Sequence, residues 1–188
     1  IPDGVKLGKL DSLLKRVQGT LRTDDIALHQ ISLAPEGFDA RFSALSRTYE
    51  YRIDDRSSKR NPLHHLFTYR SSFSLDDAAM NVVSQKLCGL HDFAAFCRPK
   101  PGATTIRHLT HFAWTRDADG ILTGSVIADA FCHSMVRSLV GSAVAVGRGR
   151  LGVKEVVELR NKGERTSAWT TMAAKGLTLI SVEYPPDE

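Results

Sequence analysis

Hydrophobic positions follow a helical period at the start of the chain and a strand-like alternation soon after. Residues 5–19 carry apolar side chains three and four positions apart, which predicts a surface helix with one buried stripe ending at Gly19; the stripe is Leu7, Leu10, Leu13, Leu14 and Val17. Residues 26–33 and 47–53 alternate like strands and are expected to be sheet partners, with a turn at 35–37 between them. In the second strand, one face carries Arg47, Tyr49, Tyr51 and Ile53.

The rest of the chain continues this mixture of strands and helices. A charged loop over 54–62 precedes a strand-like stretch at 66–70, and a capping-box pattern at 74–77 opens a helix that ends near Gly89. Residues 106–116 and 121–127 form a predicted hairpin, and the remaining elements are an apolar helix, a short helix over 154–161 and a last strand over 177–184. The order predicts an α+β fold, and the length of 188 residues predicts one domain, or one domain with a small appendage.

The apolar run over 130–147 is long enough to suggest a membrane span. It contains Arg137 near its middle, which costs about 2.5–3.5 kcal/mol at the centre of a membrane helix, and it also carries a histidine and several serines. The sequence therefore predicts a buried helix and no membrane association.

Composition adds little to the pattern. The 188 residues are 42% hydrophobic and 24% charged, and the net charge of +4 permits an anionic partner without demanding one. Three widely spaced cysteines and the absence of metal-ligand spacing favour a reducing cytoplasm and predict no metal. The chain opens on Ile1 and shows no signal peptide, so we expect a fragment of a longer protein.

Two residues of these elements could carry chemistry. Arg137 is the only formal charge between Asp129 and Arg148, and it needs an anion, either in a structural ion pair or as a clamp on a ligand or nucleophile. Tyr49 either packs in the sheet or stacks on a base and exchanges a proton. The basic loops 56–60 and 98–100 are either solvated turns or contacts to a nucleic-acid backbone.

A further candidate is the stretch LRTDDIALH, Leu21 to His29. A carboxylate beside an arginine, with a histidine nearby, is typical of a catalytic loop. A hydrolase that uses Asp24 with His29 would bring those side chains together in one cleft.

Five motifs in this order resemble the tRNA pseudouridine synthase A family: FDARFSALSRTYEYRI, LCGLHDFAAFC, TTIRHL, DAFCHSMVRSLVGSAVAVGRG and KGLTLISVEYP. The resemblance covers nearly the whole chain. It implies the pseudouridine-synthase fold, a mostly antiparallel sheet with helices packed on it, in a single domain over residues 1–188. It also implies a cofactor-free cytoplasmic homodimer that isomerises uridine to pseudouridine at positions 38–40 in the anticodon stem-loop of tRNA.

The resemblance also assigns roles residue by residue. Arg137 matches the arginine that pairs with the catalytic aspartate, and Tyr49 matches the tyrosine placed against the target base. Substrate-binding roles are implied for Arg41, Arg107, Phe131 and His133.

The family's nucleophile lies in a Gly-Arg-Thr-Asp-Ala-Gly-Val-His motif upstream of the ARFSA segment. Here LRTDDIAL stands where the family has a Leu-Pro-x-Asp-Ile element, with Asp25 and Ile26 matching its last two residues. The resemblance therefore implies that this chain is a C-terminal domain whose nucleophile is supplied by a missing N-terminal part, and that the chain alone is inactive. The alternative is a non-catalytic RNA-binding or dimerisation module of the same fold.

Overall fold

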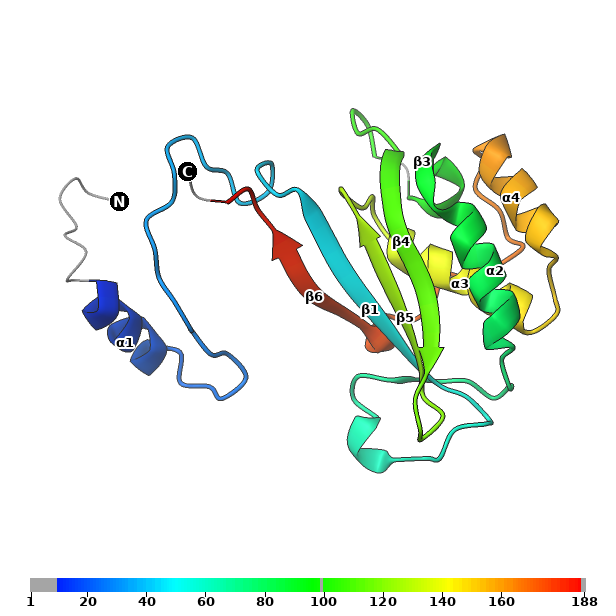
Figure 1. Cartoon of the computed structure of the whole chain (residues 1–188), viewed down its shortest axis with the longest axis horizontal. Coiled ribbons are helices and arrows are strands. Elements are labelled where there is room, and N and C mark those ends of the chain that lie inside the picture. Colours follow the sequence, from blue (N-terminus) through cyan, green and yellow to red (C-terminus); the bar gives the residue numbers. More distant parts are fainter. Residues whose placement is uncertain (1–9, 99, 187–188) are drawn as a thin grey trace. The chain divides into compact units, whose positions relative to one another are not determined.

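Figure 1 shows the computed structural model of the chain, in which residues 10–98 and 100–186 are described. The chain divides into two compact units. The first, the N-terminal unit, comprises Ile1–Ala40 with Asp187–Glu188, and the second, the sheet unit, comprises Arg41–Pro186.

The N-terminal unit has one helix among its described residues, α1 (Leu10–Thr20). This confirms the predicted helix over that range, while residues 5–9 and Leu7 lie outside the described residues. No residue of α1 is buried, so the predicted buried stripe is wrong there. Within the described part of this unit, no second helix or strand is present to cover the stripe.

The strand predicted over residues 26–33 does not form. The side chain of Gln18 donates to the Ile26 carbonyl at 3.1 Å and accepts from the Leu28 amide at 2.7 Å. A side chain thus satisfies backbone groups that a neighbouring strand would otherwise bond. The expected pairing of residues 26–33 with 47–53 is therefore wrong. The turn at 35–37 is confirmed by a bond from the Phe38 amide to the Pro35 carbonyl at 3.1 Å.

The sheet unit is built on a mostly antiparallel sheet of six strands. These are β1 (Ser46–Asp54), β2 (Tyr69–Arg70), β3 (Gly89–Asp92), β4 (Ile106–Arg116), β5 (Leu122–Ala128) and β6 (Leu177–Glu183). Among the described strands the order is β2-β1-β5-β4-β3, β6 also pairs with β1, and only the β1–β2 pair is parallel. The predicted hairpin and last strand are confirmed, and so is the α+β class.

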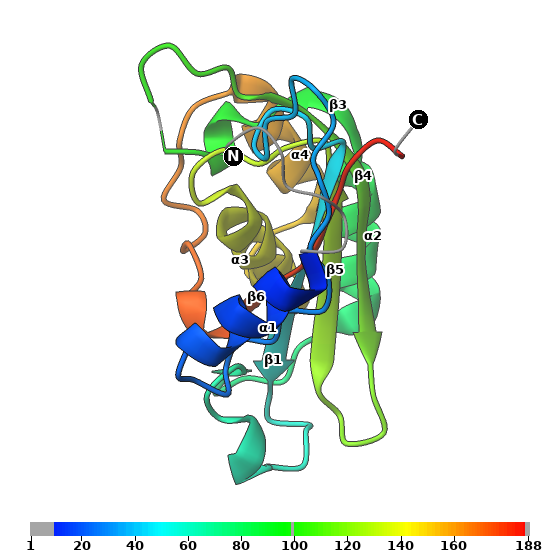
Figure 2. The ribbon, with the colours of Figure 1, turned by 90° about the vertical axis from the view of Figure 1, so that its left-hand side faces the viewer.

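The helices of this unit are α2 (Asp77–Leu87), α3 (Met135–Gly147) and α4 (Val153–Lys162), with short 3-10 turns η2 (Pro62–His64), η3 (Ala94–Phe96) and η4 (Ala174–Gly176). α2 packs on β4, α3 and α4, and Figures 1 and 2 show the strands side by side with α2 and α3 next to them. Every second residue of β5 is buried, as expected for a sheet with one covered face. The predicted capping box over 74–77 is wrong, because Ala79 at the third helical position has no side chain that could return a bond. The helix is capped two residues later than Ser74, by Asp76, whose side chain accepts from the Ala79 amide at 2.9 Å.

α3 is the centre of the core. Every residue of it except Arg137 is buried, which confirms the predicted buried helix. Its serines are satisfied internally: Ser142 donates to the Leu139 carbonyl at 2.7 Å, and Ser138 accepts from the Trp169 indole at 2.9 Å. Among the residues that the structure describes, no helix has the length and apolar character needed to span a membrane.

Asp55, which the sequence placed in a charged loop, is instead fully buried. Arg116 donates to both of its carboxylate oxygens, at 3.1 and 3.2 Å, and the amides of Leu75 and Ser57 donate at 2.8 and 2.9 Å. Burial by itself would raise the pKa of Asp55, but the bonds from Arg116 and the two amides hold that pKa below its usual value. The carboxylate therefore joins the end of β1, the start of α2 and the β4–β5 hairpin.

We expect Asp55→Asn to lower the free energy of unfolding at neutral pH by about 2–3 kcal/mol, because Arg116 loses its buried counter-ion. A carboxyl whose pKa is depressed by folding stabilises the fold above its unfolded pKa, near 4, and this contribution disappears as the pH falls through the lower folded pKa. The gap between parent and variant in urea melts should therefore close in acid. Asp119→Asn, an exposed control on the same hairpin, should cost little; equal losses for both variants would contradict this assignment.

Candidate active site

Tyr49 and Arg137 line one hollow of the sheet unit, which we call the site hollow. Its volume is about 310 Å³, and it is lined by Tyr49, Phe131, Cys132, His133, Ser134, Met135, Val136, Arg137 and Leu177. β1 supplies the tyrosine, the first turn of α3 supplies the arginine, and the segment between β5 and α3 supplies Phe131 and His133. Four of the six predicted site residues therefore share one cavity wall.

Arg137 reaches this hollow because it is the one residue of α3 that is not buried. Its guanidinium donates to the Met172 carbonyl at 3.3 Å and to the Ser134 hydroxyl at 3.2 Å. No carboxylate among the described residues forms an ion pair with it. The structural ion pair that was one reading of Arg137 is thus absent from residues 10–98 and 100–186, and two neutral oxygens orient the cation instead.

The segment that Arg137 contacts is held tightly against α3. A side chain at Gly141 would come within 2.1 Å of the Thr170 carbonyl, so only glycine permits this approach. The Tyr51 hydroxyl donates to the Ala173 carbonyl at 2.8 Å, and burial raises the pKa of Tyr51 above its usual value. Tyr51 therefore stays protonated and fixes the segment that positions Arg137.

Tyr49 is half-buried and meets Phe131 edge to face, with ring centroids 5.2 Å apart at 88°. This is the favourable T-shaped geometry for two aromatic rings. The contact fixes the tyrosine ring and leaves it on the wall of the hollow.

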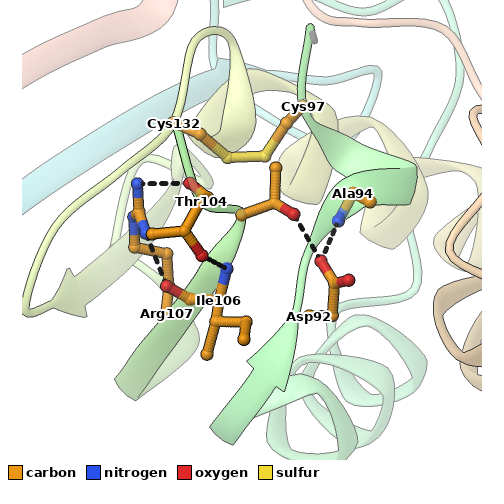
Figure 3. The surroundings of a disulfide bond; sticks show 8 residues. Asp92, Ala94, Cys97, Thr104, Ile106, Arg107 and Cys132 are labelled. Carbon is orange, nitrogen blue, oxygen red and sulfur yellow. Dashed lines mark hydrogen bonds between the residues drawn. A yellow bond between two sulfur atoms is a disulfide. The ribbon is translucent and has the colours of Figure 1, made fainter. Parts of the chain in front are cut away.

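The sequence did not indicate how the segment carrying Phe131 and His133 is anchored. Cys132 forms a disulfide with Cys97, which Figure 3 shows beside Arg107 and Thr104. The Arg98 amide donates to the His133 carbonyl at 3.0 Å, and the Asp129 carboxylate accepts from the His108 amide at 3.0 Å. Three cysteines allow three pairings, so spacing alone could not have selected this one.

The sequence also did not indicate Ser134 as a residue of the site. It has a left-handed backbone, with φ of 67°, and it precedes α3 without capping it through its side chain. A non-glycine residue in this region is strained by about 1–3 kcal/mol, and such strain is concentrated at functional sites. Here the conformation accompanies the contact between the Ser134 hydroxyl and Arg137.

Two predicted substrate-binding residues lie outside the site hollow. Arg41 is exposed, with its guanidinium 5.4 Å from the centre of the Phe42 ring. Arg107 donates to the carbonyls of Ile106 and Thr104, as Figure 3 shows. Neither is among the residues that line the hollow.

The carboxylates of Asp24 and Asp25 in LRTDDIALH make only local contacts. Asp24, Asp25 and His29 are exposed. Thr23 bonds the Asp25 side chain at 3.4 Å and its amide at 3.2 Å, and neither aspartate is hydrogen-bonded to His29. The described residues therefore give no support to a hydrolase pair.

Comparison with known proteins decides the family. The sequence model described as "tRNA pseudouridine synthase" matches residues 83–185, more than half of the chain. The chain belongs to the tRNA pseudouridine synthase family. The matched region contains Arg137 and the rest of α3, which confirms the resemblance drawn from the motifs.

Individual relatives in this family agree. The chain is 51% identical over 178 residues to tRNA pseudouridine synthase A of Leifsonia xyli subsp. xyli, covering 94% of this chain and 62% of the relative. It is 47% identical to the protein of the same name from Frankia casuarinae, covering 100% of this chain and 67% of the relative. A third, from Streptomyces avermitilis, is 43% identical, with 95% and 62% covered. The chain thus spans slightly less than two thirds of the length of most of these relatives.

Proposed function

We propose that this chain is the C-terminal part of a tRNA pseudouridine synthase, which isomerises uridines at positions 38–40 of the anticodon stem-loop. The observation that carries the proposal is that Tyr49 and Arg137 line the same hollow, in a chain that belongs to this family. A planar ring and an oriented cation suit a flipped base and an anionic nucleophile.

The proposed reaction needs no cofactor. An aspartate attacks the sugar carbon C1′ of the flipped uridine, and the glycosidic bond from C1′ to N1 breaks. The base rotates, and its carbon five bonds to C1′ and displaces the aspartate, which is released unchanged. Carbon five then loses its proton, and N1 gains one. A nearby cation lowers the pKa of a carboxyl by about 1–3 units, so Arg137 keeps the attacking aspartate ionised and aimed. Tyr49 holds the base, and its phenol oxygen takes up the proton that leaves carbon five as the phenol passes its own proton to water.

The attacking aspartate comes, in this proposal, from a part of the protein outside this chain. Arg137 has no carboxylate partner among the described residues, and Asp24 and Asp25 are exposed with only local contacts. The relatives are also longer than this chain. A carboxylate supplied from that extra length would complete the ion pair.

The partners follow from the same proposal. tRNA is the substrate, Arg41 and Arg107 contact it outside the site hollow, and the protein works as a homodimer in the cytoplasm. Self-association is favoured by exposed apolar side chains on β6, where Leu179 and Ile180 are about half exposed. In a reducing compartment Cys97 and Cys132 would face each other as thiols, and the bonds at Arg98 and Asp129 would still anchor the segment.

The direct test is to map pseudouridine in tRNA after incubation with the full-length protein. Unmodified tRNA and variants with cytidine at positions 38, 39 or 40 would be compared. New pseudouridine confined to these positions is expected. Pseudouridine found only at other positions would contradict the proposed target positions. No pseudouridine at any position would contradict the proposed activity.

A further inference from the structure

Six basic side chains line three adjoining hollows of the sheet unit, and Tyr49 lines none of the three. We call them the basic band: Arg56, Arg60, Arg70, Arg148, Arg150 and Lys175. The first hollow, of about 450 Å³, is lined by Arg60, Arg70 and Lys175, and the second, of about 470 Å³, by Arg70, Arg148 and Arg150. The third, of about 320 Å³, is lined by Arg56, Arg148 and Arg150. Each hollow therefore shares an arginine with the next.

Most of the band has no structural task. Arg70 pairs with Asp54 at 2.5 Å, and the Arg148 guanidinium lies 3.6 Å from the centre of the Phe73 ring. The side chains of the other four, Arg56, Arg60, Arg150 and Lys175, are exposed and form no hydrogen bond or ion pair with any described residue. Cations that lie close together without counter-ions repel one another. Such a cluster is typical of a surface that binds an anionic partner.

The form of the band favours a chain of phosphates over a single anion. Among the residues that line the three hollows, Asp54 is the only carboxylate, and Arg70 and the Ser58 hydroxyl already bond it. Exposed hydroxyl groups at Ser72 and Ser74 line the same hollows as the guanidinium groups. Charges distributed over three hollows match the repeated charges of a polynucleotide.

The band is also connected to the site hollow. The second hollow is lined by Gly141 and Met172, and the Met172 carbonyl accepts from Arg137. Arg148 follows Arg137 by 11 positions along α3, which corresponds to about 16 Å along the helix axis. An RNA strand that leaves the site hollow in the direction of the end of α3 would cover this span within several nucleotides.

We infer that the basic band binds the phosphate backbone of the tRNA substrate beyond the target uridine. This rests on the proposed function and extends it with a second contact surface, formed by the β1–β2 loop that carries η2, the end of α3 and η4 (Figure 1). Such contacts position the substrate without reading its sequence.

The test uses two double variants of this chain with the same change of charge. Arg56→Ser with Arg150→Ser removes two band cations that have no structural partner, and Lys154→Ser with Lys162→Ser removes two exposed cations of α4 as the control. tRNA binding would be measured by filter retention across a salt series, after thermal melts confirm that both variants are folded. The band variant should bind about tenfold more weakly at low salt, and its salt slope should fall by roughly 1.5–2 because two phosphate contacts are lost.

The control should keep the parent's slope. Equal losses in both variants, or no loss in the band variant, would overturn the inference, and so would a parent chain that binds no tRNA. The same substitutions in the full-length protein separate this inference from the proposed function. In the full-length protein, the band substitutions should raise KM for tRNA and leave kcat unchanged. A fall in kcat with no change in KM would also overturn the inference that the basic band binds tRNA. Pseudouridine formed by the unaltered full-length protein would show that the proposed function stands even if the band fails.

Discussion

Arg137→Met in the full-length protein is expected to lower kcat by about 100- to 1,000-fold while leaving tRNA affinity nearly unchanged. Removing one oriented group that stabilises charge at a reaction centre typically costs this much. The guanidinium is held by Met172 and Ser134 at the wall of the site hollow. In the proposed mechanism, its loss removes the counter-charge of the attacking carboxylate. Single-turnover pseudouridine formation and filter binding on the same preparations would separate the two effects.

Two further variants sharpen this prediction. Arg137→Lys keeps the charge but not the planar pair of donors, so we expect partial activity between the parent and Arg137→Met. Lys154→Met removes an exposed cation of α4 and should leave the rate unchanged. If Arg137→Met weakened tRNA binding and left kcat intact, Arg137 would be a phosphate contact.

Substitutions of Tyr49 are expected to have the second large effect. Tyr49→Leu removes the ring and the hydroxyl, and kcat/KM should fall by at least about 100-fold because both stacking and proton transfer are lost. Tyr49→Phe keeps the ring and its contact with Phe131, so tRNA affinity should survive while kcat falls by about 100-fold.

Tyr184→Phe provides the matched control, because Tyr184 also lies in the sheet unit but lines neither the site hollow nor the three hollows of the basic band. It should turn over like the parent. Normal turnover by both Tyr49 variants would assign Tyr49 a packing role only.

In the elements that the sequence predicted well, the spacing of apolar residues matches the spacing of the residues that are buried. β5 alternates along its whole length and β1 alternates from Tyr51 onward because one face of the sheet is covered there, and α3 is apolar nearly all round because it is buried nearly all round. Periodicity failed over residues 26–33, which alternate equally well, because Gln18 bonds the backbone there and none of the described strands pairs with these residues. Alternation states which residues could share a face, but it does not supply the partner strand.

The site could be predicted in part for a similar reason. A lone charge in an apolar helix pointed to Arg137, and the strand register put Tyr49 on a covered face. The positions of Arg41 and Arg107 away from the hollow depend on side-chain direction, which a motif does not state. The link between Cys97 and Cys132 spans 35 positions and required the fold to bring the residues together.

The central claim is that this chain supplies Arg137 and Tyr49 while the nucleophile lies outside it. Pseudouridine formation in tRNA tests it most directly, measured by mass spectrometry for this chain alone and for the full-length protein with and without Asp24→Asn or Asp25→Asn. We predict no pseudouridine from the chain alone, and full-length variants that turn over nearly as fast as the parent, since these exposed carboxylates make only local contacts. Pseudouridine formed by the purified chain and abolished by either substitution would contradict the account.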